Sequence, residues 1–296
     1  GRTAILEMAA ASGMTLLTPE ERNPMRTSTY GTGELILEAL KQGAENMLIG
    51  IGGSATVDGG AGMAEALGYR FYDAQNRPLH ALRGESLRKI AHIDGSAVDR
   101  SLFRCDIRIA SDVTNPLLGE EGAAAVFAPQ KGATPEMIPL LEEGLRNLSS
   151  VLIRQGMIDR ADQPGDGAAG GLGMGLRAFC SARTESGARL AMETTRFESL
   201  LPGTDYVITG EGCTDPQTEH GKLCAEIAEV CRKHRVKCIL LSGAVQGSRE
   251  SPAPLFWKTK AATPAGLPFE EIRLNAGRFL SNAARELAEE LRAASR

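Results

Sequence analysis

Two apolar runs that end at glycines constrain the fold of this chain more than any other feature. Residues 48–51 lead into Gly52-Gly53-Ser54, and residues 206–209 lead into Gly210-Glu211-Gly212. A buried parallel strand is a short apolar run of this kind, and glycine lets the backbone turn tightly and approach a ligand. Ligands of open α/β sheets bind beyond the carboxyl ends of the strands. The two runs therefore predict an α/β fold with a polar, phosphate-handling site.

Composition restricts the classes of protein to which the chain can belong. Its 296 residues are enough for two lobes. A net charge of −4 and an aromatic content of 4% do not favour nucleic-acid binding. No stretch approaches the roughly 20 apolar residues of a membrane span. The six cysteines form neither CxxC pairs nor a zinc spacing, which is typical of reduced thiols in a cytoplasmic protein.

The amino-terminal end suggests a fragment. The chain opens at Gly1-Arg2 without a methionine, and an apolar run begins at once with residues 3–6. We interpret this as entry in the middle of a domain.

Hydrophobic periodicity predicts alternating strands and helices. Strands are expected at residues 3–9, 47–51, 69–72, 106–110, 205–209 and 237–241, and helices at 32–42, 62–67, 135–155, 222–234 and 270–294. The strand, helix and strand of residues 205–241 form a βαβ unit, which favours a parallel sheet. Residues 79–104 are weakly patterned, and the glycine-dense residues 161–175 are either a linker or a functional loop.

Two segments bear on nucleotide-binding motifs. Gly50-x-Gly52-x-x-Ala55, with Asp73 further on, matches the dinucleotide fingerprint, so a nicotinamide-dependent oxidoreductase is one alternative. A P-loop is excluded, because at the Gly221-Lys222 pair Pro216 stands in place of the first glycine.

Carboxylates follow several of the predicted strands. They are Asp58, Asp112, Glu211 and Asp215, in loops that also carry Ser54, Thr56, Ser111, Thr114 and Thr214. Phosphoryl transfer needs acidic oxygens for Mg²⁺, backbone amides and a cation for phosphate, and a carboxylate near the acceptor hydroxyl. Lys131 and Lys222 could supply the cation. For any one of these acids, a helix cap or a turn is the alternative role.

At these residues the chain resembles the glycerate kinase type 1 family. The motifs that carry the resemblance are residues 49–56 with 58–63 and 66–68, residues 111–119, 127–133 and 167–173, and residues 208–212 through Asp215, Gln217-Thr218 and 220–222. The resemblance implies two α/β lobes around a cleft. Residues 1–185 would mainly form the middle α/β lobe, and residues 186–296 the carboxyl-terminal part of a flavodoxin-like parallel-sheet lobe.

The sequence departs from the family pattern in three places. Cys213-Thr214 stands where the family usually has Arg-Leu, and Pro216 replaces the usual serine before Gln217. The family's amino-terminal segment is also expected to be missing. The lost arginine could weaken the binding of an anionic substrate.

The resemblance implies ATP- and Mg²⁺-dependent phosphorylation of a hydroxyl of D-glycerate, with the 2- and 3-hydroxyls both open. From the chemistry we assign Asp215, Asp112 and Lys222 as catalytic residues, and Asp112 and Glu211 as metal ligands. Substrate and nucleotide would be bound by Gly52, Gly53, Ser54, Thr56, Asp58, Thr114, Asn115, Lys131, Gly210, Glu211 and Gly212. Expected partners are small molecules and a second copy of the chain. A binding or regulatory module that has lost catalysis is the non-enzyme alternative.

Overall fold

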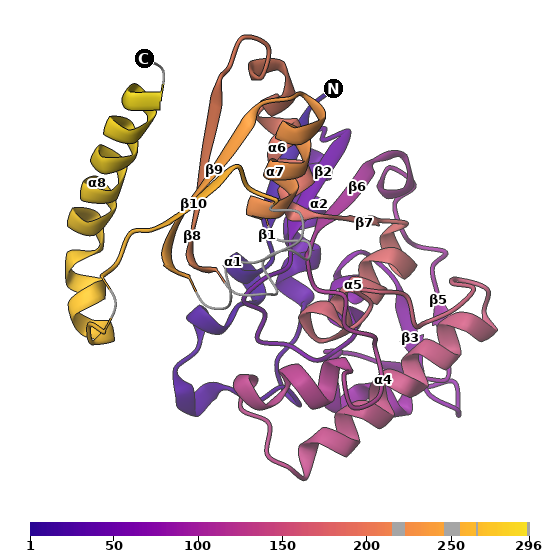
Figure 1. Ribbon diagram of the computed structural model, residues 1–296. Coiled ribbons are helices and arrows are strands. Elements are labelled where there is room, and N and C mark those ends of the chain that lie inside the picture. Colours follow the sequence, from indigo (N-terminus) through magenta and orange to yellow (C-terminus); the bar gives the residue numbers. More distant parts are fainter. Residues whose placement is uncertain (215–222, 246–254, 265, 295–296) are drawn as a thin grey trace. The chain divides into compact units, whose positions relative to one another are not determined.

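The chain divides into two compact units, Gly1–Glu185 and Ser186–Arg296. The computed structural model describes residues 1–214, 223–245, 255–264 and 266–294, and Figure 1 shows the order of their helices and strands. Both units combine helices with parallel strands, so the predicted α/β class is confirmed. Among the described helices, none is both long and apolar enough to cross a membrane.

A four-stranded parallel sheet organises the first unit. Its strands are β1 (Thr3–Glu7), β2 (Asn46–Gly50), β6 (Asp106–Ala110) and β7 (Arg183–Glu185), in the order β1-β2-β6-β7. The apolar side chains of β2 and β6 alternate with more accessible neighbours, and Ile49 and Ile109 are fully buried. Gly50 pairs with Ala110, so the carboxyl ends of these two strands lie at the same edge.

The expected strands at residues 47–51 and 106–110 are confirmed, but the one at 3–9 is too long. The chain leaves β1 after Glu7 and enters the short helix α1 (Ala9–Ser12). The remaining helices of this unit are α2 (Tyr30–Lys41), α3 (Ala61–Ala66), α4 (Met137–Arg154) and α5 (Ala168–Cys180). Helix α4 buries Leu141, Leu145, Leu148 and Leu152, whose spacing places them on one face.

Shorter elements complete the first unit. A small antiparallel sheet consists of β4 (Pro78–Leu79), β3 (Arg70–Tyr72) and β5 (His92–Asp94) in the order β4-β3-β5, and of these strands only β5 lies wholly within the weakly patterned residues 79–104. The 3-10 turns are η1 (Met14–Leu16), η2 (Pro19–Glu21), η3 (Gly84–Lys89), η4 (Leu102–Arg104) and η6 (Pro129–Lys131), and η5 (Ala123–Phe127) is a π-helical turn.

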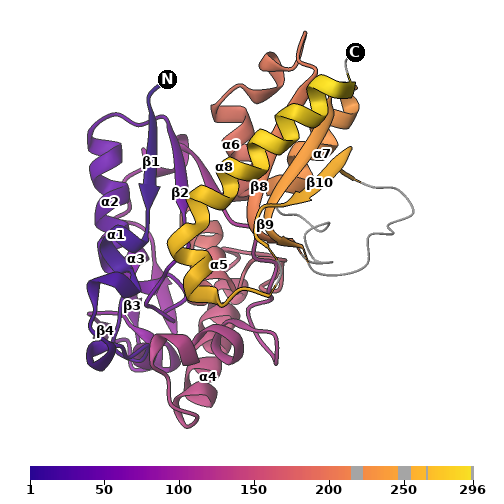
Figure 2. The same ribbon diagram turned by 60° about the vertical axis from the view of Figure 1, so that its left-hand side comes forward.

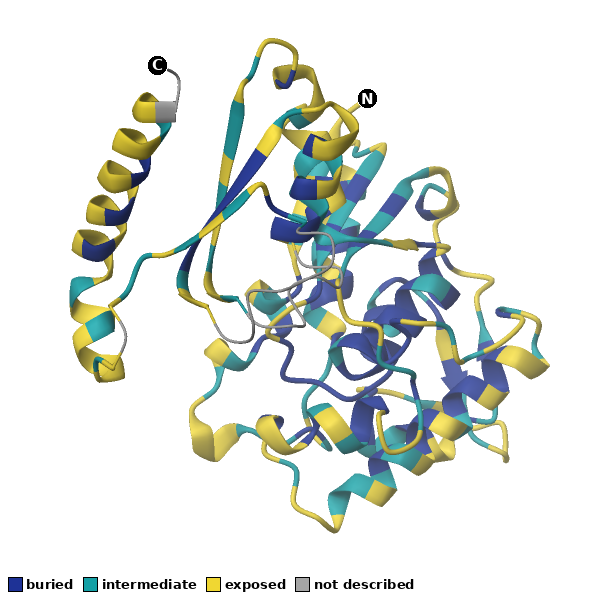
Figure 3. Ribbon diagram, in the orientation of Figure 1, coloured by how far each residue is buried: buried dark blue, intermediate teal, exposed yellow. Residues whose placement is uncertain are grey.

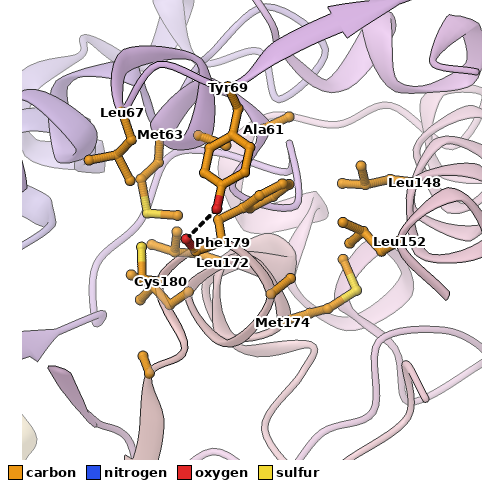
Figure 4. Packing of buried hydrophobic residues seen from close by; sticks show 14 of the residues in the cluster. Ala61, Met63, Leu67, Tyr69, Leu148, Leu152, Leu172, Met174, Phe179 and Cys180 are labelled. Atoms are coloured by element: carbon orange, nitrogen blue, oxygen red, sulfur yellow. Dashed lines mark hydrogen bonds between the residues drawn. The ribbon is translucent and has the colours of Figure 1, made fainter. Parts of the chain in front are cut away.

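The main hydrophobic core lies entirely within the first unit, which carries most of the buried residues in Figure 3. Tyr69 meets Phe179 edge-on, with ring centroids 5.0 Å apart, and donates its hydroxyl to the Phe179 carbonyl at 2.8 Å. Figure 4 shows this pair among the methionine and leucine side chains of α3, α4 and α5. Since the phenol is satisfied, the ring can be buried without an unpaired polar group.

The glycine-dense segment is part of this core, so the linker interpretation is wrong. Gly170 and Gly171 have φ of +71° and +88° within the first turn of α5, and the Gly170 carbonyl accepts from Gly59 N at 3.1 Å. A Cβ at Gly175 would strike the Gly59 backbone. Asp166 is buried and pairs with Arg177 of α5 at 2.8 Å. Glycine is required here because two backbone segments touch.

A three-stranded parallel sheet, ordered β10-β9-β8, organises the second unit. Its strands are β8 (Tyr206–Thr214), β9 (Lys237–Val245) and β10 (Lys258–Ala261). Its helices are α6 (Gly187–Thr194), α7 (Leu223–Lys233) and α8 (Phe269–Ala294), with the turn η7 (Phe197–Leu200). β8, α7 and β9 form the predicted βαβ unit, with β8 and β9 parallel.

Helices α7 and α8 pack on opposite faces of this sheet. Leu240 of β9 packs with Cys224, Ala228 and Cys231 of α7. Its neighbours Ile239 and Leu241 point to the other face, where they pack with Leu287 of α8. The long helix α8 crosses in front of the strands in the turned view of Figure 2.

The second glycine segment forms a strand instead of the predicted loop. Strand β8 continues through Gly210, Glu211 and Gly212 to Thr214, and Glu211 pairs in register with Ser242 of β9. The neighbouring strand continues equally far and offers backbone partners, so the glycines do not end the ladder. Without side chains at Gly210 and Gly212, β8 can still pair closely with β9.

Candidate active site

The candidate site lies at the carboxyl edge of the first unit's parallel sheet. The segment after β2 exposes Gly52 and Gly53, and the segment after β6 exposes Asp112 and Thr114. Because Gly50 and Ala110 are neighbours in register, both segments start from the same edge. The structure thus brings two of the predicted ligand-binding segments together, where an open α/β sheet binds its ligands.

The glycine loop after β2 is fixed by hydrogen bonds to Ser12 of α1, to Met14 and to Thr27. Met14 N donates to the Gly53 carbonyl at 2.9 Å, and Ala55 N donates to the Ser12 carbonyl at 3.0 Å. The Thr27 hydroxyl donates to the Ala55 carbonyl at 2.7 Å. These bonds hold residues 53–55 in place while the Gly52-Gly53 backbone faces solvent. Such a fixed turn can present amide groups to an anion.

Asp58 is fully buried and its carboxylate is bound by protein donors. It accepts the Thr29 amide and hydroxyl, both at 2.8 Å, and the amides of Gly60 and Gly62 at 3.2 and 3.3 Å. Burial raises the pKa of Asp58, and these donors oppose the rise. The carboxylate caps the start of α3 and ties it to the segment before α2. This geometry favours a supporting role for Asp58 over contact with a ligand.

Lys131 is buried directly beneath the glycine loop. Its exposed fraction is 2%, and its Nζ donates to Ser54 Oγ at 2.7 Å and to the Thr56 carbonyl at 2.8 Å. Burial lowers the pKa of Lys131 to about 7, and the Asp58 charge opposes that shift. The ammonium group therefore binds the loop itself. This differs from the predicted role, in which Lys131 would bind a phosphate directly.

Thr56 and Asn115 differ in their hydrogen bonding. The Thr56 hydroxyl is buried and has no hydrogen-bond partner within the described ranges. Asn115 Nδ2 donates to the Glu121 carbonyl at 2.9 Å, and the Asn115 carbonyl accepts from Gly167 N at 3.1 Å. Asn115 thereby links the segment after β6 to the start of the glycine-dense segment.

Two residues of this edge were missed in the sequence. Thr29 is fully buried and joins the Asp58 carboxylate to α3, because its hydroxyl also accepts from Met63 N at 2.9 Å. Glu7 ends β1, and its carboxylate lies against Gly50, where a Cβ would collide with it. An acid at the end of an apolar strand was the signal used for Asp112, and the same signal could have found Glu7. Nothing local in the sequence marks Thr29.

The remaining predicted site residues belong to the second unit or lie outside the described ranges. On β8, Glu211 is partly buried and its Oε1 accepts from the Thr214 hydroxyl at 2.8 Å. Asp215 and Lys222 lie outside the described residues. The two proposed metal ligands, Asp112 and Glu211, are in different units, so their pairing stays a prediction. Across the described ranges, no group of three or more His, Cys, Asp or Glu side chains could hold a metal ion.

The dinucleotide fingerprint is not borne out by the local geometry. Such a motif requires a helix to begin at the glycine turn, so that its amino terminus faces the pyrophosphate. Here a loop runs from Gly52 to Gly60, and α3 begins only at Ala61. The match at Gly50-x-Gly52-x-x-Ala55 is therefore coincidental.

Comparison with known proteins gives the family of this α/β chain. Residues 1–292 match the profile described as the Glycerate kinase family. The chain belongs to the glycerate kinase family. A crystal structure of a protein from Salmonella typhimurium LT2, named as a candidate glycerate kinase 2, aligns with a TM-score of 0.85 and 42% identity, covering 99% of this chain and 77% of that one.

Relatives named as glycerate kinases are similar in sequence. Glycerate kinase of Bacillus subtilis (strain 168) is 41% identical over 297 residues, which cover 99% of this chain and 77% of the relative. Glycerate 2-kinase of Escherichia coli (strain K12) is 45% identical over 245 residues, covering 83% of this chain. That alignment spans 64% of the Escherichia coli protein. These coverages do not by themselves support the expectation that an amino-terminal segment is missing.

Proposed function

We propose that this chain takes part in the ATP-dependent phosphorylation of a hydroxyl of D-glycerate. The observation that carries the proposal is the family match over residues 1–292. It is supported by relatives named glycerate kinase at 41–45% identity, and by the exposed glycine turn beside Asp112 at the edge of a parallel sheet. A cytoplasmic location and a second copy of the chain as partner stay predictions.

In the proposed reaction the glycine loop binds an anionic group. The Gly52 and Gly53 amides and the Ser54 hydroxyl would donate to a phosphate or to the glycerate carboxylate. Asp112 would face the acceptor hydroxyl and take its proton as the phosphoryl group is transferred. Asp215 stays the other candidate for this base, and Lys222 stays the candidate phosphate cation. Gly210, Glu211 and Gly212 of β8 stay candidate nucleotide-binding positions.

The candidate ligands are carboxylate oxygens, which are of the kind that binds Mg²⁺. Mg²⁺ is commonly held by one or two carboxylates together with substrate phosphates, so a cage of protein ligands is not required. Asp112 is an exposed carboxylate at the sheet edge, and Glu211 is the second candidate. A bound Mg²⁺ would supply charge neutralisation on the phosphates.

The test is a coupled assay for ADP release with D-glycerate and ATP, on the purified full chain and on Asp112→Asn. Asparagine keeps the shape of the side chain but removes the charge. Loss of a general base typically lowers the rate by roughly 10²–10⁴-fold, and kcat should fall far more than nucleotide affinity. Asp159→Asn, at a side chain that is 79% exposed, is the matched control.

The outcomes separate the alternatives. Release of ADP that requires glycerate supports a kinase, and reduction of a nicotinamide without ADP release would support the oxidoreductase. Binding of ATP without turnover would support a module that has lost catalysis. The Escherichia coli relative is named a glycerate 2-kinase, so the product should be analysed for 2- and 3-phosphoglycerate. If the full chain is active and Asp112→Asn keeps its kcat, Asp112 is not the base.

A further inference from the structure

We propose that Lys131 is a positioning residue, whose ammonium group makes the Ser54 hydroxyl a dedicated hydrogen-bond donor at the base of the Gly52-Gly53 turn. The proposal deepens the proposed function, on which it rests for the identity of the ligand. It assigns Lys131 an action through Ser54 and the loop backbone, without contact to substrate.

The hydrogen-bond geometry carries this assignment. A protonated lysine has three N–H donors and no acceptor. Nζ lies 2.7 Å from Ser54 Oγ and 2.8 Å from the Thr56 carbonyl, so it bridges two positions of one loop. Because an ammonium group cannot accept, the Ser54 hydroxyl accepts from Lys131 and must direct its own proton elsewhere. That proton is then available to a ligand at the adjoining turn.

Burial keeps Lys131 away from a ligand. Lys131 is 2% exposed and Ser54 is 5% exposed, whereas the adjoining Gly52 and Gly53 are exposed, so Ser54 separates the lysine from a ligand bound at the turn. A buried cation is costly unless a charge or hydrogen bonds compensate it. Two oxygens of the loop and the buried Asp58 carboxylate provide part of that compensation, and burial still lowers the pKa of Lys131.

The backbone around Lys131 is also fixed. Lys131 ends the 3-10 turn η6, and Gly132 follows at φ +90°. The Arg22 main chain packs against Gly132, where it leaves no room for a Cβ. Asp58 and Arg22 are charged residues of segments next to Lys131 and Gly132. Since both chain segments at Lys131 are held, its ammonium group can act as a rigid support for the loop.

The charge of Lys131 makes the ligand affinity of the loop depend on pH. Burial lowers the pKa of Lys131 to about 7. Above that pH the neutral amine has a lone pair, so the Ser54 proton can turn toward Lys131 and away from the ligand. We expect the ligand affinity of the loop to fall as pH rises through about 7, and we expect this decrease to be absent in Lys131→Met.

The first experiment is a double-mutant cycle in the full chain, with Ser54→Ala, Lys131→Met and both together. The KM values for ATP and D-glycerate are measured across pH. Each single change should raise the same KM by roughly tenfold, with a smaller effect on kcat, and the double variant should be no worse than either. Additive losses would show that Lys131 acts independently of Ser54 and would overturn the proposal. Lys41→Met, at an exposed lysine on α2, is the control for loss of charge.

The second experiment does not depend on activity. Ala55 N donates to the Ser12 carbonyl within the loop, so its hydrogen exchange reports how firmly the loop is held. Exchange at Ala55 should be roughly tenfold faster in Lys131→Met and in Ser54→Ala, and unchanged at Ile49 in β2. Unchanged exchange at Ala55 in both variants would overturn the proposal even in an active enzyme. Faster exchange in a chain that does not phosphorylate glycerate would support it while the proposed function fails.

The free energy of unfolding checks that Lys131 titrates in the folded chain. The ordinary lysine pKa is 10.5 and the folded value is about 7. Between these two pKa values the unfolded chain binds more protons at Lys131 than the folded chain does. The contribution of Lys131 to the free energy of unfolding therefore rises with pH over this range, and it is lost as pH falls through about 7. The stability of the wild type relative to Lys131→Met should therefore rise from pH 7 to pH 10. A constant difference would show that the pH dependence of the loop does not come from Lys131.

Discussion

At the scale of residues, three buried polar side chains hold the loops of the candidate site. Thr29, Asp58 and Lys131 come from segments far apart in the sequence, and each is at most 2% exposed. Each makes hydrogen bonds to a backbone group that would otherwise be buried without a partner. Removing one of them should affect stability as well as catalysis, because a buried donor or acceptor left unpaired is costly.

Asp58→Asn is expected to lower the free energy of unfolding by roughly 2–4 kcal/mol. The substituted amide would turn an N–H group toward the donors of Thr29, Gly60 or Gly62, and Lys131 would lose its opposing charge. Urea unfolding measures the effect. Asp159→Asn, at an exposed carboxylate, should stay within about 0.5 kcal/mol of the wild type. An equally small change in Asp58→Asn would show that the buried carboxylate does not support the fold.

Gly52→Val is expected to abolish ligand binding while the protein still folds. A Cβ at Gly52 meets no atom within 4 Å, so the side chain fits the free protein but would block a ligand at the turn. Gly53 is a poorer position for this test. Its φ of +70° would impose strain of roughly 1–3 kcal/mol on valine, so lost binding could reflect a distorted loop.

The measurement is the thermal shift produced by ATP and by D-glycerate, compared in the wild type and Gly52→Val. Wild-type shifts in a variant of unchanged stability would exclude the Gly52 backbone from the site.

At the scale of elements, close contact between glycines decides how α5 packs. The kinked start of α5 lies against residues 56–60, and Gly59 N donates to the Gly170 carbonyl. A Cβ on Gly60 would approach the Gly175 Cα to 3.0 Å. This packing links the glycine loop to the hydrophobic core, so changes in α5 should be transmitted to the candidate site.

Gly175→Ala is expected to destabilise the chain by roughly 1–3 kcal/mol, because the added methyl group overlaps the Gly59 backbone. Gly277→Ala in α8 is the matched control. Its Cβ meets nothing within 4 Å, and alanine is the better helix former by roughly 0.5–1 kcal/mol. The melting temperature should therefore fall in Gly175→Ala and rise in Gly277→Ala. A shift of the same sign in both variants would contradict the steric explanation.

At the scale of the whole molecule, the hydrophobic cores are separate. Every buried residue of the main cluster lies between Met8 and Ala182, and the two smaller clusters lie between Leu201 and Leu287. The division at Glu185 falls directly after β7, which pairs with β6. Each unit thus has its own parallel sheet and its own hydrophobic core, as independently folding domains do.

Residues 1–185 are therefore expected to fold without the second unit. The isolated segment should give a cooperative urea transition, with exchange protection in β2 and β6 equal to that in the full chain. Expression of 1–185 and circular dichroism check this directly. A non-cooperative transition, or exposed apolar surface detected by dye binding, would show that the second unit is required.

The long, patterned elements could be predicted from the sequence. The strand at 106–110 agrees at both ends with β6, and the helix at 135–155 lies within two residues of α4 at each end. β7 could not be predicted, because Arg183-Thr184-Glu185 has no apolar pattern. It is a strand only because β6 offers an edge with unpaired backbone groups. β10 was missed for the same lack of local signal, whereas α6 was missed although Ser186 caps its first turn and its apolar Ala188 and Leu190 are buried.

The sequence by itself determined the α/β class, the positions of the main strands and helices, the exposed glycine turn and the family. Each of these depends on local patterns of apolar residues and glycines. Only the tertiary structure decided that Lys131 supports the loop, that Asp58 is fully buried, and that Gly210-Glu211-Gly212 continues a strand. Those outcomes depend on partners up to 77 residues away, such as Ser54 for Lys131. A hydrogen bond over that distance is created by the packing of the elements and leaves no trace in the local sequence.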